Sequence, residues 1–334
     1  MTAAPQAIGG ERAGIFDAVA ASIRRNTWIV ALVGLLIGFL AFTRFIQPNY
    51  GAPGIQGLAI SVLPIAFAAV AQAIVVISGG IDLSVGSIMA LTSVTSAVLM
   101  QDQSDAVALG IVLGVIVMGV ALGTINGALI VVTRVPDIVV TLAMAFVWAG
   151  FALLILDTPG GGAAQWLMEL IRGPLGNEWL PRAVVVLVVV VGLVWIPLRR
   201  STLGLSLYAI GSNQLAAFRS GVPVGRTKIV SYAITGFFAA LGGLTLTAST
   251  GIGSPVPGSY TLESVAAIVL GGVSLAGGRG GIVGPILAVV ILALIRTDLT
   301  FLGVNPNLST AVQGAILIGV VMFGSFLAMR KVRA

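Results

Sequence analysis

The chain has 334 residues, of which 58% are hydrophobic and only 8% are charged. Soluble domains carry roughly 45–50% apolar and about 25% charged residues, so this composition excludes a soluble globular fold. Three tracts, Trp28–Thr43, Ala183–Leu198 and Leu308–Met329, contain no charged residue. A helix needs about 20 apolar residues to cross a bilayer, so the sequence predicts an all-α integral membrane protein. A transmembrane barrel would alternate polar and apolar residues, and these tracts do not.

The charged and reactive residues exclude several classes of function. The net charge is +6, but the basic residues lie beside the apolar tracts, which indicates membrane topology and not nucleic-acid binding. The chain has no Cys and no His, which removes disulfides, thiolate chemistry and most transition-metal sites. Neither lysine, Lys228 nor Lys331, ends the glycine pattern of a phosphate-binding loop. We therefore expect no catalytic residue, metal or cofactor in this chain.

In chain order, residues 1–26 are predicted to form a cytoplasmic segment. Its apolar residues between Glu11 and Arg25 fall on one helical face, which is typical of an interfacial amphipathic helix, although a disordered tail is the alternative. Residues 27–334 are predicted to form a single transmembrane domain of about ten helices. The expected crossings are Thr27–Ile46, Ile55–Ser78, Leu83–Met100, Ala106–Val132, Ile138–Leu156, Arg182–Leu198, Ile229–Ser249, Leu262–Ala276, Ile282–Ile295 and Leu308–Met329.

A polar insert, residues 199–228, separates two groups of these tracts. It holds five of the 17 basic residues and no acidic residue. Short loops rich in Lys and Arg stay on the cytoplasmic side of a membrane, so the insert orients the chain with both termini cytoplasmic. Within it, residues 213–220 are predicted to form a short helix, with Asn213 or Ser212 as N-cap and Gly221 as the C-terminal stop.

A short glycine pattern, G-G-x-x-x-x-V-G, occurs twice, at Gly79–Gly86 and at Gly277–Gly284. Both copies fall at predicted cytoplasmic turns. The repetition is consistent with duplicated halves, and equally with coincidence in a chain that is rich in glycine.

Four segments carry a resemblance to a known family. They are VISGGIDLSVGS (Val76–Ser87), NGALIVVTRVPDIVVTLAM (Asn126–Met144), LYAIGSNQLAAFRSGV (Leu207–Val222) and YTLESVAAIVLGGVSLAGGRG (Tyr260–Gly280). In this order and spacing they resemble the ribose-type ABC sugar permeases, over roughly residues 55–330. The chain departs from the family's pattern at Asp137 and at Phe146–Gly150.

The resemblance implies the permease subunit of an ATP-driven importer for a monosaccharide or similar small polar solute, in the bacterial cytoplasmic membrane. It implies a second permease copy or paralogue, two ABC-type ATPase subunits that bind ATP and Mg, and an extracytoplasmic solute-binding protein. The lipid bilayer is the remaining partner, and nucleic acid is not one. The insert then becomes an ATPase-coupling loop, whose expected contact residues are Gly211, Ser212, Asn213, Ala216, Ala217, Arg219, Ser220 and Gly221.

Each of these assignments has an alternative. The insert could serve only as a linker, and Arg279 either anchors the topology or contacts the ATPase. Glu263 either stabilises a helix N-terminus through the helix dipole or forms an external gate or sugar contact, with Tyr260 as a stacking surface. A self-sufficient secondary transporter or channel for a small neutral solute is the alternative function. A membrane enzyme is the other, and no paired carboxylates support it.

Three polar residues of the apolar tracts are further candidates for the solute path. Asp82 is the only charged residue between Arg44 and Asp102. It either caps a helix that starts at Leu83, accepting from the backbone N–H of Ser84 or Val85, or takes part in the path or an inner gate. Ser84 and Asn126 either allow close helix packing or supply neutral hydrogen-bonding groups to the solute.

Overall fold

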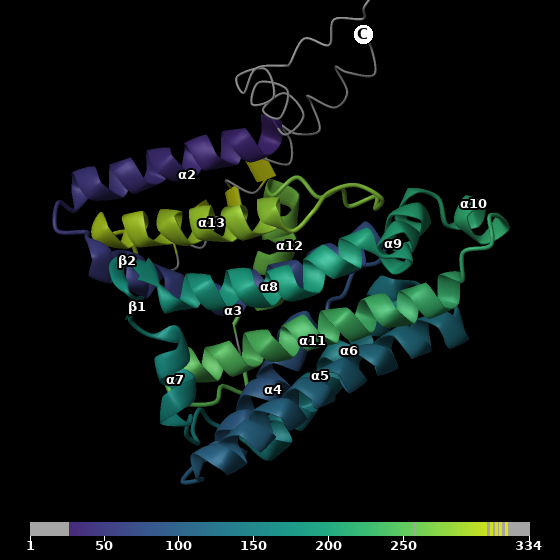
Figure 1. The fold of residues 1–334 in the computed structure, drawn as a ribbon, viewed down its shortest axis with the longest axis horizontal. Helices are drawn as coiled ribbons and strands as arrows, with labels where there is room; N and C mark the ends of the chain where they lie inside the picture. The colour runs from purple at the N-terminus through teal and green to yellow at the C-terminus, as the bar shows by residue number, and fades with distance from the viewer. Residues whose placement is uncertain are drawn as a thin grey trace, which may run out of the picture.

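The computed structural model describes residues 27–256, 258–305 and the short stretches 308–309, 311–312, 314–315 and 318–319. The predicted amphipathic helix in residues 1–26 and most of the predicted last span lie outside these residues. Within them the fold is built from helices, joined by one small hairpin (Figure 1). An all-α membrane protein is therefore confirmed.

The long helices are α2 (Thr27–Ile46), α3 (Ala52–Ile77), α5 (Asp105–Thr133), α6 (Asp137–Ile155), α8 (Arg182–Arg200), α11 (Val224–Thr250) and α13 (Val283–Phe301). The shorter ones are α4 (Val85–Met100), α7 (Gln165–Ile171), α9 (Thr202–Ser212), α10 (Gln214–Arg219) and α12 (Tyr260–Leu270). Strands β1 (Pro174–Leu175) and β2 (Asn177–Pro181) form the antiparallel hairpin. In the part of the chain that the structure describes, the 7 long helices have the length and composition of membrane spans.

Two predicted crossings, Leu83–Met100 and Leu262–Ala276, are shorter helices than expected. The first becomes the 16-residue α4, and the second becomes the 11-residue α12. The prediction for α12 extended too far because Gly271 and Gly272 end the helix, the latter with φ 80°. The following helix, α13, in turn runs six residues past Ile295, its predicted end, to Phe301. Apolar composition alone does not separate a complete crossing from a shorter one.

Helix α3 forms the centre of the molecule. In its most hydrophobic segment 83% of the residues are buried, whereas in the corresponding segment of α2, at the edge of the molecule, only 11% are. Helix α3 packs against α11, α12 and α13, whereas α2 packs chiefly against α13. A helix that is apolar on all sides is covered by its neighbours, so α3 is the central helix against which the others pack.

Close packing of α5 on α11 depends on a glycine ridge. Gly119, Gly123 and Gly127 recur every four residues and therefore share one face of α5. This face contacts Tyr232 and Gly236 of α11 so closely that a Cβ on Gly123 would overlap the carbonyl oxygen of Tyr232. Small residues let helix backbones approach in lipid, where dispersion contacts replace the hydrophobic effect.

The two copies of the glycine pattern share two features of their local structure. Gly79 and Gly277 both adopt left-handed φ, 82° and 84°, which places each pattern in a turn between two helices. The valine of each pattern, Val85 or Val283, is the first residue of the following helix. The two turns differ elsewhere, because Gly278 and Gly280 also have positive φ, 68° and 125°, whereas Gly80 and Asp82 at the equivalent positions do not.

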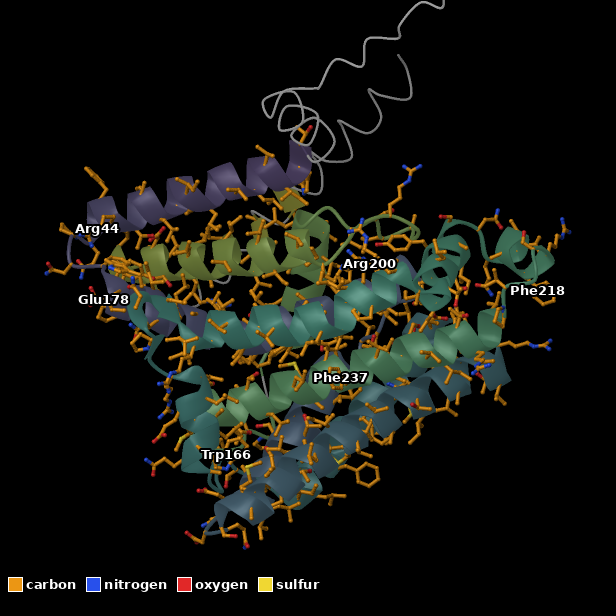
Figure 2. All side chains as sticks on the ribbon, in the orientation of Figure 1. Arg44, Trp166, Glu178, Arg200, Phe218 and Phe237 are labelled. Atoms are coloured by element: carbon orange, nitrogen blue, oxygen red, sulfur yellow. The ribbon has the colours of Figure 1, made fainter. Side chains whose placement is uncertain are left out.

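The two ends of the molecule have different structures. Helices α9 and α10 lie at one end, and α7 with the β hairpin lies at the other (Figure 1). Figure 2 shows Arg200 and Phe218 at the first end and Arg44 and Glu178 at the opposite end. The insert and the predicted external loops are thereby separated by the length of the helices.

Candidate functional site

The insert contains the short helix that the sequence predicts. Asn213 is the N-cap of α10, and its Oδ1 accepts from the backbone N–H of Ala216 at 2.9 Å. Beyond its C-terminus, Gly221 takes φ 83°, a conformation that favours glycine. The helix and its caps are confirmed, whereas its partner contacts stay a prediction.

The expected contact residues of α10 are exposed, with Ala217 as the exception. Leu215 and Phe218 are 58% and 67% exposed, three residues apart on one side of the helix. Ala217 is only 5% exposed and turns inward. Phe218 extends from the end of the molecule (Figure 2). Leu215 and Phe218 are therefore two large apolar side chains available to a partner beside the exposed Ala216 and Arg219, and Ala217 supports the helix from beneath.

Gly211, at the end of α9, joins the insert to both glycine turns. The backbone N–H of Gly278 donates to the carbonyl oxygen of Ile77 at 3.0 Å. Gly211 lies so close to this hydrogen bond that a Cβ there would overlap both of its atoms. A Cβ on Gly277 would be 3.0 Å from the Cα atoms of Gly79 and Gly211. We call this contact of Gly79, Gly211 and Gly277 the glycine junction.

Arg279 lies in the turn that contacts α9. The hydroxyl of Tyr208, on α9, donates to the carbonyl oxygen of the adjacent Gly280 at 2.8 Å. The Arg279 side chain is exposed. The structure thus places Arg279 on the same end of the molecule as α10, and either of its two predicted roles fits this position.

A chain of hydrogen bonds ends at Asp82, in the turn between α3 and α4. Trp148 Nε1 donates to Asn126 Oδ1 at 3.3 Å, Asn126 Nδ2 donates to Ser84 Oγ at 2.7 Å, and Ser84 Oγ donates to Asp82 Oδ1 at 2.6 Å. The backbone N–H of Ser84 donates to the same oxygen at 2.8 Å. Each donor in this chain points in the direction of the carboxyl group, and the bonds can reinforce one another in a buried place.

The capping prediction for Asp82 is partly right. The bond from the N–H of Ser84 is the predicted one. The helix begins at Val85 and not at Leu83, so Ser84 is the N-cap and Asp82 stabilises the turn before it. Asp82 is fully buried, and its Oδ2 has no hydrogen-bond partner among the described residues. Asp82, Ser84 and Asn126, three predicted path residues, therefore form one buried cluster.

A second buried cluster was missed by the sequence analysis. Lys228 Nζ lies 3.0 Å from Asp137 Oδ1, and both side chains are only 12% exposed. The hydroxyl of Tyr232 donates to Asp137 Oδ2 at 3.0 Å. The pair joins the first turns of α6 and α11. The available signal was Asp137 itself, where the chain departs from the family's pattern.

The remaining two predicted path residues, Tyr260 and Glu263, line a cavity. It measures about 540 Å³ and lies between the end of α11, the start of α12 and the far part of α13. Its polar lining comprises Thr250, Ser254, Ser259, Tyr260, Glu263, Arg296, Thr300 and Ser309. Arg296, which the sequence analysis did not single out, pairs with Glu263 at 2.8 Å.

The cavity and the Asp82 turn are connected at one contact. The backbone N–H of Gly86, in α4, donates to Thr261 Oγ1 at 2.9 Å, and Thr261 follows Tyr260 at the start of α12. The N-termini of α4 and α12 therefore meet inside the helix assembly. Helix N-termini that meet between transmembrane helices are a recurring construction of solute sites in transporters.

The comparisons with known proteins agree with this architecture. Residues 54–321 match the family described as branched-chain amino acid transport system / permease component. A ribose import permease of Bacillus subtilis is 36% identical over 252 residues, covering 74% of this chain and 77% of the relative. An autoinducer 2 import system permease of Yersinia enterocolitica is 32% identical over 313 residues, covering 90% and 92%. A fructose import permease of Rhizobium meliloti is 31% identical over 316 residues, covering 91% and 86%.

No solved structure matches the chain. The family match covers most of the sequence, so the chain belongs to this family of transport permeases. It is a permease component of an ABC importer and a multi-pass protein of the bacterial inner membrane. The resemblance on the four sequence segments is confirmed.

Proposed function

We propose that the chain forms the membrane path for a monosaccharide or similar polyol, with alternating access driven by separate ATPases. Two ATPase subunits bind ATP and Mg, a second permease copy or paralogue completes the path, and a solute-binding protein delivers the solute. The chain crosses the membrane about ten times with both termini in the cytoplasm. The observation that carries the proposal is the contact of the insert with both glycine turns at Gly211.

The choice of solute rests on the relatives and on charge. The family's description names branched-chain amino acids, whereas the three relatives above are named for ribose, fructose and autoinducer 2. A free amino acid brings two charges, each of which needs a partner in a buried site. The charged residues of the cavity, Glu263 and Arg296, already neutralise each other. A neutral polyol fits this arrangement better.

The insert is the proposed coupling element. A groove on an ATPase can accommodate the exposed Leu215 and Phe218, and Arg279 offers a second contact on the same end of the molecule. Movement of α10 then reaches the α3–α4 and α12–α13 turns through the glycine junction. Because backbone touches backbone there, without a flexible side chain between, a displacement is transmitted directly.

The proposal is tested by reconstituting the chain in proteoliposomes with and without its ATPase and binding protein. We expect ATP-dependent sugar uptake only from the complete assembly. Phe218→Asp should lower ATPase binding and uptake at least tenfold, since it puts a charge into an apolar contact. Leu175→Asp, an exposed apolar site at the opposite end, is the matched control. Uptake by the chain alone would instead support a self-sufficient transporter.

A further inference from the structure

We infer that the 540 Å³ cavity is a polyol-binding site, in which the Glu263–Arg296 ion pair recognises neighbouring hydroxyl groups and Tyr260 supports the apolar face of the sugar ring. The inference rests on the proposed function and adds to it a location and a recognition chemistry. The volume lies within the range of about 300–1,000 Å³ that is common for small-molecule sites.

The ion pair is held in place and can still be reached. Ser259 Oγ donates to Glu263 Oε1 at 2.6 Å, and Arg296 Nη2 donates to the same oxygen at 2.8 Å. In the described part of the chain, the hydrogen bonds of Glu263 thus use Oε1, which leaves Oε2 to accept from a ligand. The side chains of Arg296 and Glu263 are 49% and 23% exposed. The carboxylate is therefore oriented before a ligand arrives, which lowers the entropic cost of binding.

The chemistry of the lining selects a neutral polyol. One sugar hydroxyl can donate to the carboxylate while its neighbour accepts from the guanidinium, and neither bond requires the ion pair to break. Hydrogen bonds to ionised groups are about twice as strong as neutral ones. Thr250, Ser254 and Thr300 add neutral donors and acceptors. An ionised solute would have to compete with the pair for each charge.

The cavity also has the right position for a path. Tyr260 lines it and is the first residue of α12, and the next residue, Thr261, accepts from Gly86 at the start of α4. The two residues before α4 are Leu83 and the buried Ser84, whose hydroxyl donates to Asp82. A sugar that leaves the cavity inward would therefore reach the polar turn between α3 and α4.

The test measures sugar binding to the purified full chain in lipid nanodiscs, without ATPase or binding protein. D-ribose and D-fructose are the probes, detected by saturation-transfer NMR. We expect Glu263→Gln and Tyr260→Leu each to weaken binding at least tenfold. Gln retains an acceptor for Ser259 and Arg296, so the fold should persist, and unchanged thermal unfolding would verify this. Arg182→Gln changes a partly exposed arginine that does not line the cavity and should bind normally.

Two results would overturn the site: no binding of either sugar to the unmodified chain, or normal binding by both variants. The ion pair would then be a structural link between α12 and α13 only. Uptake by the complete assembly separates this failure from failure of the proposed function. If both variants import sugar normally, the cavity is not a sugar site and the transporter assignment stands. If the unmodified complete assembly imports no sugar, the proposed function itself fails.

Discussion

The carboxylate of Asp82 is held through one of its two oxygens, and this arrangement predicts how substitutions behave. In Asp82→Asn the Oδ1 acceptor remains, so we expect the bonds from Ser84, thermal stability and sugar uptake to persist. In Asp82→Leu the N–H and hydroxyl of Ser84 lose their buried acceptor, which costs about 1–3 kcal/mol for each unsatisfied group. Thermal unfolding in detergent and uptake in proteoliposomes measure both effects. Normal unfolding of Asp82→Asn with lost uptake would show that the charge itself works in an inner gate.

Asp137 and Lys228 permit a second prediction, because each neutralises the other in a largely buried place. Lys228→Met leaves a buried carboxylate without its counter-charge, and removal of one partner of a buried pair costs about 3–5 kcal/mol. Asp137→Asn together with Lys228→Met removes both charges and should recover most of that stability. A double-mutant cycle on thermal unfolding checks this. Additive losses in the double variant would contradict the pairing.

The contact of α5 with α11 can be tested with two glycines of the same helix. In Gly123→Ala, the new methyl group meets the backbone of Tyr232 and Gly236, which cannot move aside, so we expect destabilisation by about 1–3 kcal/mol. Gly110 has no atom within 4 Å of an added Cβ. Gly110→Ala should therefore be neutral or stabilise by up to about 1 kcal/mol, the helix preference for Ala. Equal melting temperatures for the two variants would contradict the glycine ridge.

The insert holds its short helix by local contacts. Helix α10 has only six residues and cannot be stable alone. Its cap at Asn213 and the buried Ala217 fix it to the rest of the insert. In the proposed coupling, the movement of a bound partner would therefore pass to α9 and to Gly211 near its end.

The arrangement of the complete chain in the membrane can be mapped with introduced thiols, because the sequence contains no Cys. We expect Gln103→Cys and Asn177→Cys to react with a membrane-impermeant maleimide added outside intact cells. Phe218→Cys should react only after the membrane is opened. These positions lie in exposed segments, so labelling reports sidedness and not burial. Labelling of Phe218→Cys from outside would invert the proposed topology.

Much of this molecule could be predicted from the sequence because its determinants are local. The apolar tract Thr27–Ile46 is helical and ends at Ile46 as predicted, since the bilayer requires a helix of about this length. Asn213 and Gly221 bound the short helix because capping needs only neighbouring backbone groups. In both glycine patterns the first glycine has a left-handed φ and the valine begins a helix, again a local effect. The order and spacing of the four segments also indicated the family of transport permeases.

Only the tertiary structure decided which polar groups meet. Asp137 finds Lys228 across 91 residues, and Glu263 finds Arg296 across 33. Apolar tracts of similar composition gave both the long α3 and the short α12, because glycine turns and neighbouring helices set their ends. The hydrophobic effect acts on every apolar residue alike, whereas a buried charge is stable only beside one particular partner. The spacing of apolar residues along the chain therefore predicts the helices. Only the packing of helix faces determines which charged residues pair.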